Sequence, residues 1–365
     1  MSRLLKATFD CEVITPMFLG GADSNVPEIR VPGIRGALRF WLRAILGGRG
    51  LIDSKSLNKY EESILGSSDK GSSVAIRVKD KNFTTTRGAK AKAYNAGSSY
   101  LWYSVDMGRE NDKKFITPNS RFQLELRSFD KEKLILVSEA LCLLSKLGGI
   151  GSRSRRCAGS FEVVNCISSE QAVSKLFENT NEEIWKYFKD KEQRIDSKPE
   201  FAIFNSEWAQ VIKCTKSFNK WEDAVGFIGQ KFQSYRSKRG LNEGGDYDKV
   251  RGFIENGSTV NSIERVAFGL PLSFRFRTIR NGNNSANMKI VGNQDINRRA
   301  SQLHLQIKCE DGNYVPYLTV FNSKFLPNNV SVQINSGRSR EVISHGEFES
   351  LVAFTESIDD KKRMY

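Results

Sequence analysis

The sequence predicts an α+β fold of two ferredoxin-like modules packed together, and three observations support this. The first half of the chain has apolar patterns in the order strand, helix, two strands, helix, strand; this is the order of a ferredoxin-like unit with a central hairpin. The second half alternates strand and helix patterns less regularly, which fits a second unit with helical insertions. The length of 365 residues allows two domains. We expect an N-terminal module over residues 1–167 and a C-terminal module over residues 168–365.

The first half provides the clearer elements. Residues 3–15 alternate between apolar and polar side chains and indicate a strand. Residues 31–48 are bracketed by a proline near the start and a glycine pair at the end, which predicts a helix. A second glycine pair ends the helix predicted over residues 131–149. Further strands are predicted at residues 73–80, 99–105, 121–129 and 160–167, with a basic, flexible loop at 84–99.

The second half is less regular, and its elements are expected as follows. Residues 168–194, 218–236 and 347–354 have helical patterns, the first of them surface-exposed. Strands are predicted at residues 270–278, 301–309 and 314–322, with a strand start at 201–205. A loop is expected at residues 239–252 and a mobile segment at 280–293.

Composition excludes several classes of protein. Apolar residues make up 39% and charged residues 27% of the chain, which predicts a packed core. No apolar run approaches the roughly 20 residues that a membrane span needs. The N-terminus enters a strand pattern without the apolar region of a signal peptide. We therefore expect a cytoplasmic protein with no membrane partner.

The six cysteines predict neither a metal site nor a disulfide framework. No pair has CxxC spacing, and neither His304 nor His345 lies near a cysteine cluster in the sequence. Several cysteines stand in apolar segments, as Cys142 does in LCLL. Free buried thiols are expected, and no metal or other cofactor.

Positive charge is concentrated in the first half of the chain. The net charge is +14; residues 1–160 hold 27 Lys and Arg against 16 Asp and Glu, and residues 161–365 hold 29 against 26. This asymmetry favours a polyanionic partner, most simply nucleic acid. The alternative is a generally basic protein without such a partner.

The helix over residues 31–48 has a row of arginines. At 100° per residue its apolar side chains form a broad arc, while Arg35, Arg39 and Arg43 align at intervals of four. A row of phosphates would neutralise them; acidic neighbours in the protein would do the same. Trp41 stands at the edge of this row and is either a core residue or a platform on which a base stacks.

The segment LGGIGSRSRRCAGSF, residues 147–161, combines four glycines with three arginines. It follows a helix and precedes a strand, has no GK[ST], and carries Ser154 where GxGxxG needs its last glycine; these departures exclude the P-loop and Rossmann loops. The remaining interpretation is a flexible loop that grips a phosphate chain through backbone amides and Arg153, Arg155 and Arg156. A helix cap followed by a turn is the alternative.

Other candidates are weaker. Arg277, Arg280, Arg298 and Arg299 could add a basic edge in the second half. No Ser-His-Asp order, HExxH motif or carboxylate cluster is visible. His304 or His345 could act on RNA as a general base, but a non-catalytic protein is expected.

These motifs resemble the RAMP superfamily of CRISPR proteins. The matching segments are ITPMFLGGAD, IRVPGIRGALRFWLRAILG, EESILGSSDKGSSVAIRV and KLGGIGSRSRRCAGSF, with AFGLPLSFRF and RRASQLHLQI farther along. More closely, it resembles the first RAMP subunit, in the head region of the type III-B (Cmr) effector complex. It departs from the family at Cys157, where a glycine often follows the arginine pair.

The resemblance implies two RRM-like modules that bind RNA without cleaving it. It implies a ribonucleoprotein with other RAMP subunits, in which the chain holds guide RNA near its 3′ part and helps to receive target RNA in antiviral defence. By motif, the implied RNA contacts are Arg35, Arg39, Trp41, Arg43, Gly149, Gly151, Arg153, Arg155, Arg156 and Ser160. Arg298 and Arg299 complete the predicted set. Two alternatives stay open: a RAMP-type endoribonuclease that processes guide RNA, and a protein–protein adaptor.

Overall fold

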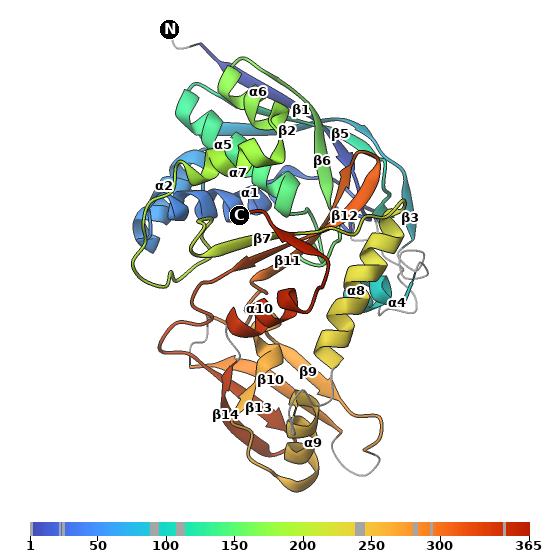
Figure 1. Cartoon of the computed structure of the whole chain (residues 1–365). Coiled ribbons are helices and arrows are strands. Elements are labelled where there is room, and N and C mark those ends of the chain that lie inside the picture. The colour runs from blue at the N-terminus through green and yellow to red at the C-terminus, as the bar shows by residue number, and fades with distance from the viewer. Residues whose placement is uncertain are drawn as a thin grey trace.

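The described part of the chain folds into three larger, mainly antiparallel sheets and one two-stranded sheet, with helices between and beside them (Figure 1). The computed structural model describes residues 3–21, 23, 26–87, 95–106, 114–237, 245–279, 284–292, 295–345 and 348–365. Its mixed helix and strand content agrees with the predicted α+β class. In Figure 1 the three sheets follow one another from the N-terminal end of the view to the opposite end.

The first sheet is built from the first half of the chain. Its strands are β1 (Leu5–Val13), β2 (Val74–Asn82), β5 (Arg121–Ser128) and β6 (Phe161–Ser168), in the spatial order β2-β5-β1-β6 with every pair antiparallel. Alternate residues of β1 are buried, as the period of a strand requires. Two helices, α1 (Val31–Gly48) and α5 (Lys131–Leu147), pack on the apolar face and on each other.

The second sheet repeats this sequence of elements later in the chain. Its strands are β7 (Ala209–Cys214), β11 (Leu303–Glu310), β12 (Asn313–Phe321) and β15 (Lys361–Arg363), in the spatial order β11-β12-β7-β15. Helix α8 (Trp221–Ser237) follows β7, and α10 (Phe348–Glu356) precedes β15. Strand, helix, strand, strand, helix, strand therefore occurs twice, with the same spatial order of strands.

The third sheet is made from two insertions into the second. Strands β8 (Ser262–Ile263), β9 (Leu272–Arg275) and β10 (Ser285–Val291) lie between α8 and β11 in the chain, and β13 (Ser331–Ser336) and β14 (Ser339–His345) lie between β12 and α10. Their order is β8-β14-β13-β10-β9, and α9 (Asp246–Asn256) packs on them around a separate core. The insertions thus contribute mainly strands, whereas the sequence predicted helical ones.

Most predicted elements are present, and several predictions were wrong. Residues 99–105 are the end of α4 (Ala96–Leu101) and the 3₁₀ helix η1 (Tyr103–Asp106), because the Asn95 side chain caps α4 by accepting from the Ser98 amide at 2.8 Å. Helix α9 occupies part of the loop predicted at 239–252, and β10 part of the segment predicted as mobile. Residues 238–244 and 280–283 lie outside the described part.

Some elements were not expected from the sequence. Helix α2 (Ser54–Leu65), capped by Asp53, follows α1. The short strand β3 (Thr85–Arg87) lies in the loop predicted at residues 84–99, of which residues 88–94 are outside the described part, and it pairs with β4 (Lys114–Ile116) farther along the chain. Residues 201–205 are irregular; the strand β7 begins a few residues later.

Helices α6 (Gln171–Glu178) and α7 (Asn181–Lys189) confirm the helical pattern over residues 168–194. Each buries one face, since Val173, Leu176 and Phe188 join the core beneath the first sheet. They are therefore exposed only on their polar faces. The division at residue 167 stays a prediction, because these helices pack with elements from before it.

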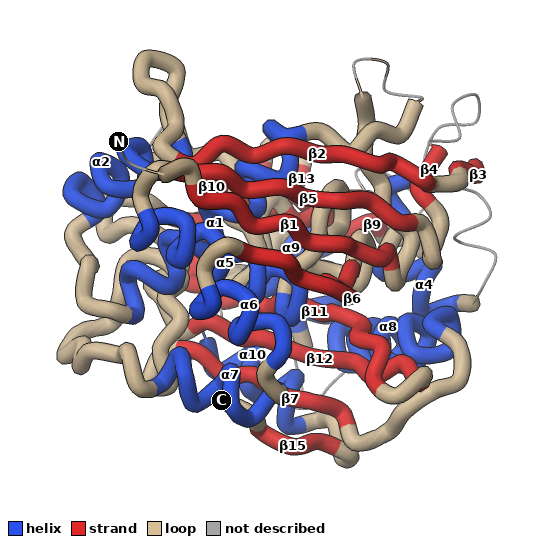
Figure 2. The backbone as a smooth tube through the Cα atoms, turned by 90° about the horizontal axis from the view of Figure 1, so that it is seen from above, coloured by secondary structure: helices blue, strands red, loops and turns tan. Residues whose placement is uncertain are grey.

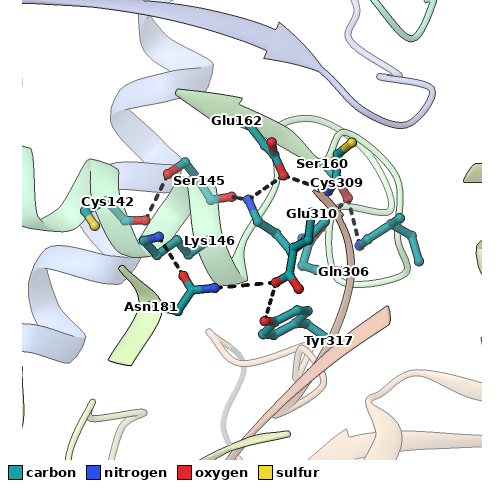
Figure 3. A network of polar contacts seen from close by, with 12 residues as sticks. Cys142, Ser145, Lys146, Ser160, Glu162, Asn181, Gln306, Cys309, Glu310 and Tyr317 are labelled. Carbon is teal, nitrogen blue, oxygen red and sulfur yellow. Dashed lines mark hydrogen bonds and ion pairs between the residues drawn. The ribbon is translucent and has the colours of Figure 1, made fainter. Parts of the chain in front are cut away.

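The first two sheets meet edge to edge, with β6 beside β11 (Figure 2). A network of polar contacts joins them (Figure 3). Lys308 Nζ lies 3.1 Å from the Glu162 carboxylate, which also accepts from the Cys309 amide at 2.8 Å. Farther along the same strand, Glu310 accepts from the Tyr317 hydroxyl at 2.6 Å. Because these groups are part-buried and paired, the first and second sheets with their helices, which we call the two modules, have a defined relative position.

Within the described part of the chain, no helix is both long and apolar enough to cross a membrane. The same residues contain no group of three or more His, Cys, Asp or Glu side chains arranged to hold a metal ion. All six cysteines are free, and four of them are buried, as the sequence predicted.

Candidate nucleic-acid interface

The glycine-rich loop between α5 and β6 is fixed between the two modules by its own backbone. The Ser152 amide donates to Phe18 O at 2.8 Å, and the Gly159 amide donates to Pro16 O at 2.9 Å. On the opposite side the Cys157 amide donates to Leu305 O at 2.9 Å, which joins the loop to β11. Further amides, those of Ile150, Arg156 and Ala158, also donate within the loop. The prediction that this loop offers its amides to phosphate is therefore wrong for these positions.

The glycines shape the loop. Gly151 has φ +98°, and a Cβ there would stand 2.5 Å from Phe18 O. Gly149 is buried, and a Cβ would meet the Ala158 and Gly159 carbonyls at 2.9 Å. Gly149 and Gly151, which were predicted to contact RNA, therefore pack against the protein's own main chain. Cys157 has φ +63°, so this departure from the family glycine occupies a backbone conformation that glycine favours.

Two arginines of the loop are held by carbonyls and aromatic rings. Arg155 donates to Ser301 O, and its guanidinium lies 5.0 Å from the centre of the Phe40 ring. Arg156 donates to Leu303 O at 3.1 Å and to Phe268 O at 3.2 Å. Neither has a carboxylate partner among the described residues.

The surroundings of Arg155 and Arg156 lower the pKa values of both guanidinium groups. Burial, with the nearby charge of Arg299, lowers the pKa of Arg155 to about 10. Burial, with the charges of Arg236 and other arginines, lowers the pKa of Arg156 to about 9. Both stay charged near neutral pH. An anion placed against them would relieve the repulsion and replace part of the lost hydration.

These arginines border a groove of about 860 Å³ to which both modules contribute. One wall contains the loop with Tyr100 and Tyr103, and the other contains η2 (Glu264–Phe268) and residues 269–273. Seven arginines line it, and none of the described lining residues is acidic. They are Arg153, Arg155, Arg156, Arg236, Arg265, Arg298 and Arg299. We call this feature the arginine groove.

The remaining members of the groove are positioned by aromatic and carbonyl contacts. The Arg153 guanidinium lies 5.5 Å from the Tyr103 ring centre, and that of Arg265 lies 4.8 Å from the Phe274 ring centre. Arg299 donates to Lys324 O at 3.0 Å, while Arg298 is exposed. Arg298 and Arg299 were predicted and join the loop arginines in space; Arg236, Arg265 and the two tyrosines were not.

The arginine row on α1 is different. Arg39 lies 2.7 Å and Arg43 lies 3.0 Å from the carboxylate of Glu61, which is only 4% exposed. Arg39 also donates to Gly66 O. Arg35 has a buried Nε without a hydrogen-bond partner among the described residues. Two of the three arginines are therefore paired with the single carboxylate of Glu61 on α2, which compensates one of their two charges; the sequence alternative of acidic neighbours had allowed this.

Trp41 and Ser160 are core residues. Trp41 is 2% exposed and packs against Phe204 and Phe321. Ser160 is 2% exposed and hydrogen-bonds the Gln306 side chain across the module boundary. A base could not stack on this tryptophan, nor a phosphate reach this serine, in the conformation described. Their assignment as RNA contacts is corrected accordingly.

His304 lies beside the glycine-rich loop, although 144 residues separate it from Ser160 in the numbering. Strand β11 crosses the loop, since Leu305 pairs with Arg156. Distance along the chain therefore does not show that His304 lies next to the loop in space. The ring is 4% exposed, and burial with the charges of Arg155 and Arg156 lowers its pKa well below the usual range. It is a neutral imidazole at neutral pH.

The outer face of the first sheet is not an aromatic platform of the kind on which RRM domains stack bases. The half-exposed residues of β1 and β5 there are polar, among them Thr8, Asp10 and Gln123. Glu125 at its centre is paired with Lys6 and Lys79. The arginine groove is thus the stronger candidate surface for a polyanion.

Comparison with known proteins places these features in a family. The model of the RAMP superfamily matches residues 10–162. The CRISPR system Cmr subunit Cmr1-2 of Pyrococcus furiosus is 31% identical over 184 residues, which are 44% of this chain and 96% of that protein. Cmr subunit Cmr1-1 of the same organism is 27% identical over 292 residues, which are 74% of this chain and 78% of that protein.

Solved structures share the fold. The crystal structure of Cmr1 from Pyrococcus furiosus in its apo form aligns with a TM-score of 0.63 and 20% identity, covering 99% of this chain and 98% of that one. A chain in the cryo-EM structure of the Type III-B Cmr-beta complex bound to cognate target RNA aligns with a TM-score of 0.57 and 14% identity, covering 98% and 99%. At these identities the likeness concerns the fold.

Proposed function

Because the chain belongs to the Cmr1 family within the RAMP superfamily, we propose that it is a non-catalytic RNA-binding subunit of a type III-B CRISPR ribonucleoprotein. Its partners are guide RNA, target RNA and other RAMP subunits. It holds the guide near its 3′ part and helps to receive the target. The two repeated β-α-β-β-α-β units are its ferredoxin-like modules.

The arginine groove is the observation that carries this proposal. Seven guanidinium groups without an acidic lining residue in the described part form a surface whose natural counterion is a polyanion. Guanidinium groups bind phosphate oxygens in pairs of hydrogen bonds. Because they contact the backbone and not the base edges, they hold RNA of any sequence.

The test is the salt dependence of RNA binding by the full chain. A labelled single-stranded RNA is titrated by fluorescence anisotropy between about 50 and 200 mM salt, and the affinity is expected to fall by tens of fold through counterion release. Arg298→Ala should weaken binding of all sequences alike and reduce the slope of log affinity against log salt by about 0.7. An affinity that does not change with salt contradicts the proposal.

Arg121→Ala is the matched control. Arg121 is 71% exposed and lies on β5 of the first sheet, away from the groove lining, where it pairs with Glu12. The substitution Arg121→Ala removes one positive charge from the protein, as Arg298→Ala does. If it weakens binding as much as Arg298→Ala does, the RNA lies on the sheet face and the groove is not the site.

A second candidate function, guide-RNA cleavage, is favoured by one observation, the position of His304 beside Arg155. Its low exposure and lowered pKa make it a weak base for a substrate hydroxyl. Incubation of the full chain with repeat RNA should give no product. Cleavage that disappears in His304→Ala would establish the enzymatic role instead.

A further inference from the structure

A second cavity opens beside the arginine groove. It has a volume of about 350 Å³, within the range of pockets that bind small molecules. Arg155, Arg299, Ala300 and Ser301 line both hollows, so the two share one border. Aromatic side chains form much of the cavity wall: Phe40, Phe201 and Phe321. We call it the aromatic pocket.

The most buried polar side chain that lines this pocket has no hydrogen-bond partner among the described residues. His304 is 4% exposed, and neither Nδ1 nor Nε2 has a hydrogen-bond partner among the described residues. Buried polar atoms are nearly always paired, because an unpaired one loses its hydrogen bonds to water without replacement. The imidazole is stacked on Phe40, with ring centres 5.1 Å apart and planes 26° apart. Its orientation is therefore held by packing and not by a hydrogen bond.

A neutral imidazole presents one donor and one acceptor in the ring plane. The edge of a nucleobase presents donors and acceptors in the same way, and its faces pack against aromatic rings. Arg155 and Arg299 lie at the shared border. If a base occupied the pocket, the phosphate of its nucleotide would lie at this border, beside the two guanidinium groups. A simple anion would not use the aromatic wall, and an apolar ligand would leave the histidine unpaired.

We propose that the aromatic pocket receives one nucleobase, turned out of the RNA strand whose phosphates occupy the arginine groove. This rests on the proposed function, because the strand must reach the pocket through the groove. Asn58, which is exposed, contacts the base edge, and Phe40 and Phe201 contact its surface. The ring nitrogens of His304 are buried in the described conformation, so the base reaches them only when the side chains around the imidazole move aside. The groove binds the phosphates of any strand, and the pocket adds affinity for a strand that carries bases.

The first experiment compares two ligands of equal length on the full chain, a single-stranded RNA and an all-abasic strand with the same phosphate backbone. We expect RNA to bind about tenfold more tightly, since stacking one base contributes about 1–3 kcal/mol. In His304→Phe and Asn58→Ala this difference should shrink severalfold, while affinity for the abasic strand stays the same. Arg298→Ala, which removes a groove residue that does not line the pocket, should weaken both ligands equally.

The outcomes separate the two proposals. If neither strand binds, the proposed function fails. If both bind equally, or if the preference for RNA survives both pocket variants, the function stands and the base pocket is wrong.

A second measurement does not depend on any variant folding. RNA carrying 5-iodouridine is irradiated with the unaltered chain, and crosslinked peptides are identified by mass spectrometry. Crosslinks to Phe40, Phe201 or His304 support the pocket. Crosslinks confined to Tyr100 and Tyr103, which line only the groove, would overturn it.

Discussion

Arginines of the same chain differ in what surrounds their guanidinium groups, and this decides their role. Arg39 and Arg43 share the buried carboxylate of Glu61, which compensates one of their two charges and holds both side chains. Arg155 and Arg156 meet carbonyl oxygens and rings, so their charge is not compensated. The sequence shows both groups as basic motifs. It could not separate them, because the compensating residue lies in α2, a helix that its pattern did not reveal.

Arg39→Ala should therefore reduce stability and leave RNA binding unchanged. The substitution removes a bond to Glu61, which is 4% exposed, and a bond to Gly66 O. Leaving a buried carboxylate with one partner fewer costs on the order of 1–3 kcal/mol. Urea unfolding measures the loss, and anisotropy measures RNA affinity. Arg121→Ala, which breaks an exposed ion pair with Glu12, should cost less than about 1 kcal/mol; a fall in RNA affinity in Arg39→Ala alone would return the α1 row to the interface.

His304 should make stability depend on pH below about 6.5. Burial, with the charges of Arg155 and Arg156, lowers its pKa in the folded protein, whereas the unfolded chain takes up a proton near pH 6.5. The unfolded state thus binds more protons below that pH, so the contribution is fully present above it and is lost as pH falls, by up to about 1.4 kcal/mol per pH unit. The difference in unfolding free energy between the unaltered chain and His304→Phe, measured from pH 7.5 to 5.5, should change in favour of the variant. A constant difference would show that the imidazole takes up a proton alike in the folded and unfolded states, so that the fold does not lower its pKa.

At the scale of elements, the long periodic segments could be predicted and the short ones could not. Helix α1 begins and ends where the proline and the glycine pair predicted. Residues 99–105 look like a strand because they are aromatic and alternate, but α4 is held as a helix by its cap and by packing on α8. That contact spans more than a hundred residues of sequence, so tertiary packing overrides the local preference.

Gly97→Ala should loosen this contact. A Cβ at Gly97 would stand 2.2 Å from Gly226 O on α8, and backbone cannot move aside as a side chain can. Overpacking of this kind costs about 1–3 kcal/mol or more. Gly36→Ala on α1 is the matched control: its Cβ meets nothing within 4 Å, and exchange of glycine for alanine in an exposed helix should gain roughly 0.5–1 kcal/mol. Thermal unfolding of both variants tests the pair, and equal melting temperatures would mean that α4 and α8 separate at no cost.

Over the whole molecule, the candidate interface is composite, and this limits what the sequence can reveal. The loop arginines stand together in the chain and were predicted, as were Arg298 and Arg299. Arg236 at the end of α8 belongs to the short basic run YRSKRG, which was not singled out, and Arg265 in η2 is an isolated arginine. Only the packing of the second module against the loop brings them to the same groove. An excess of charge in the first half was a correct signal for a basic surface but did not show that the second half forms its other wall.

Since both modules contribute to the arginine groove, RNA should stabilise the chain as a whole. A ligand that binds only the folded state adds RT ln(1 + [L]/Kd), which is about 2.7 kcal/mol at a hundredfold excess over Kd. Urea unfolding with single-stranded RNA at that excess should show this gain in one cooperative transition, and raised salt should abolish it. Arg298→Ala, compared at the same RNA concentration, should gain less because its Kd is higher, while Arg121→Ala should gain as much as the unaltered chain. Stabilisation of only one of two separate transitions would place the RNA on a single module and contradict a groove formed between the two.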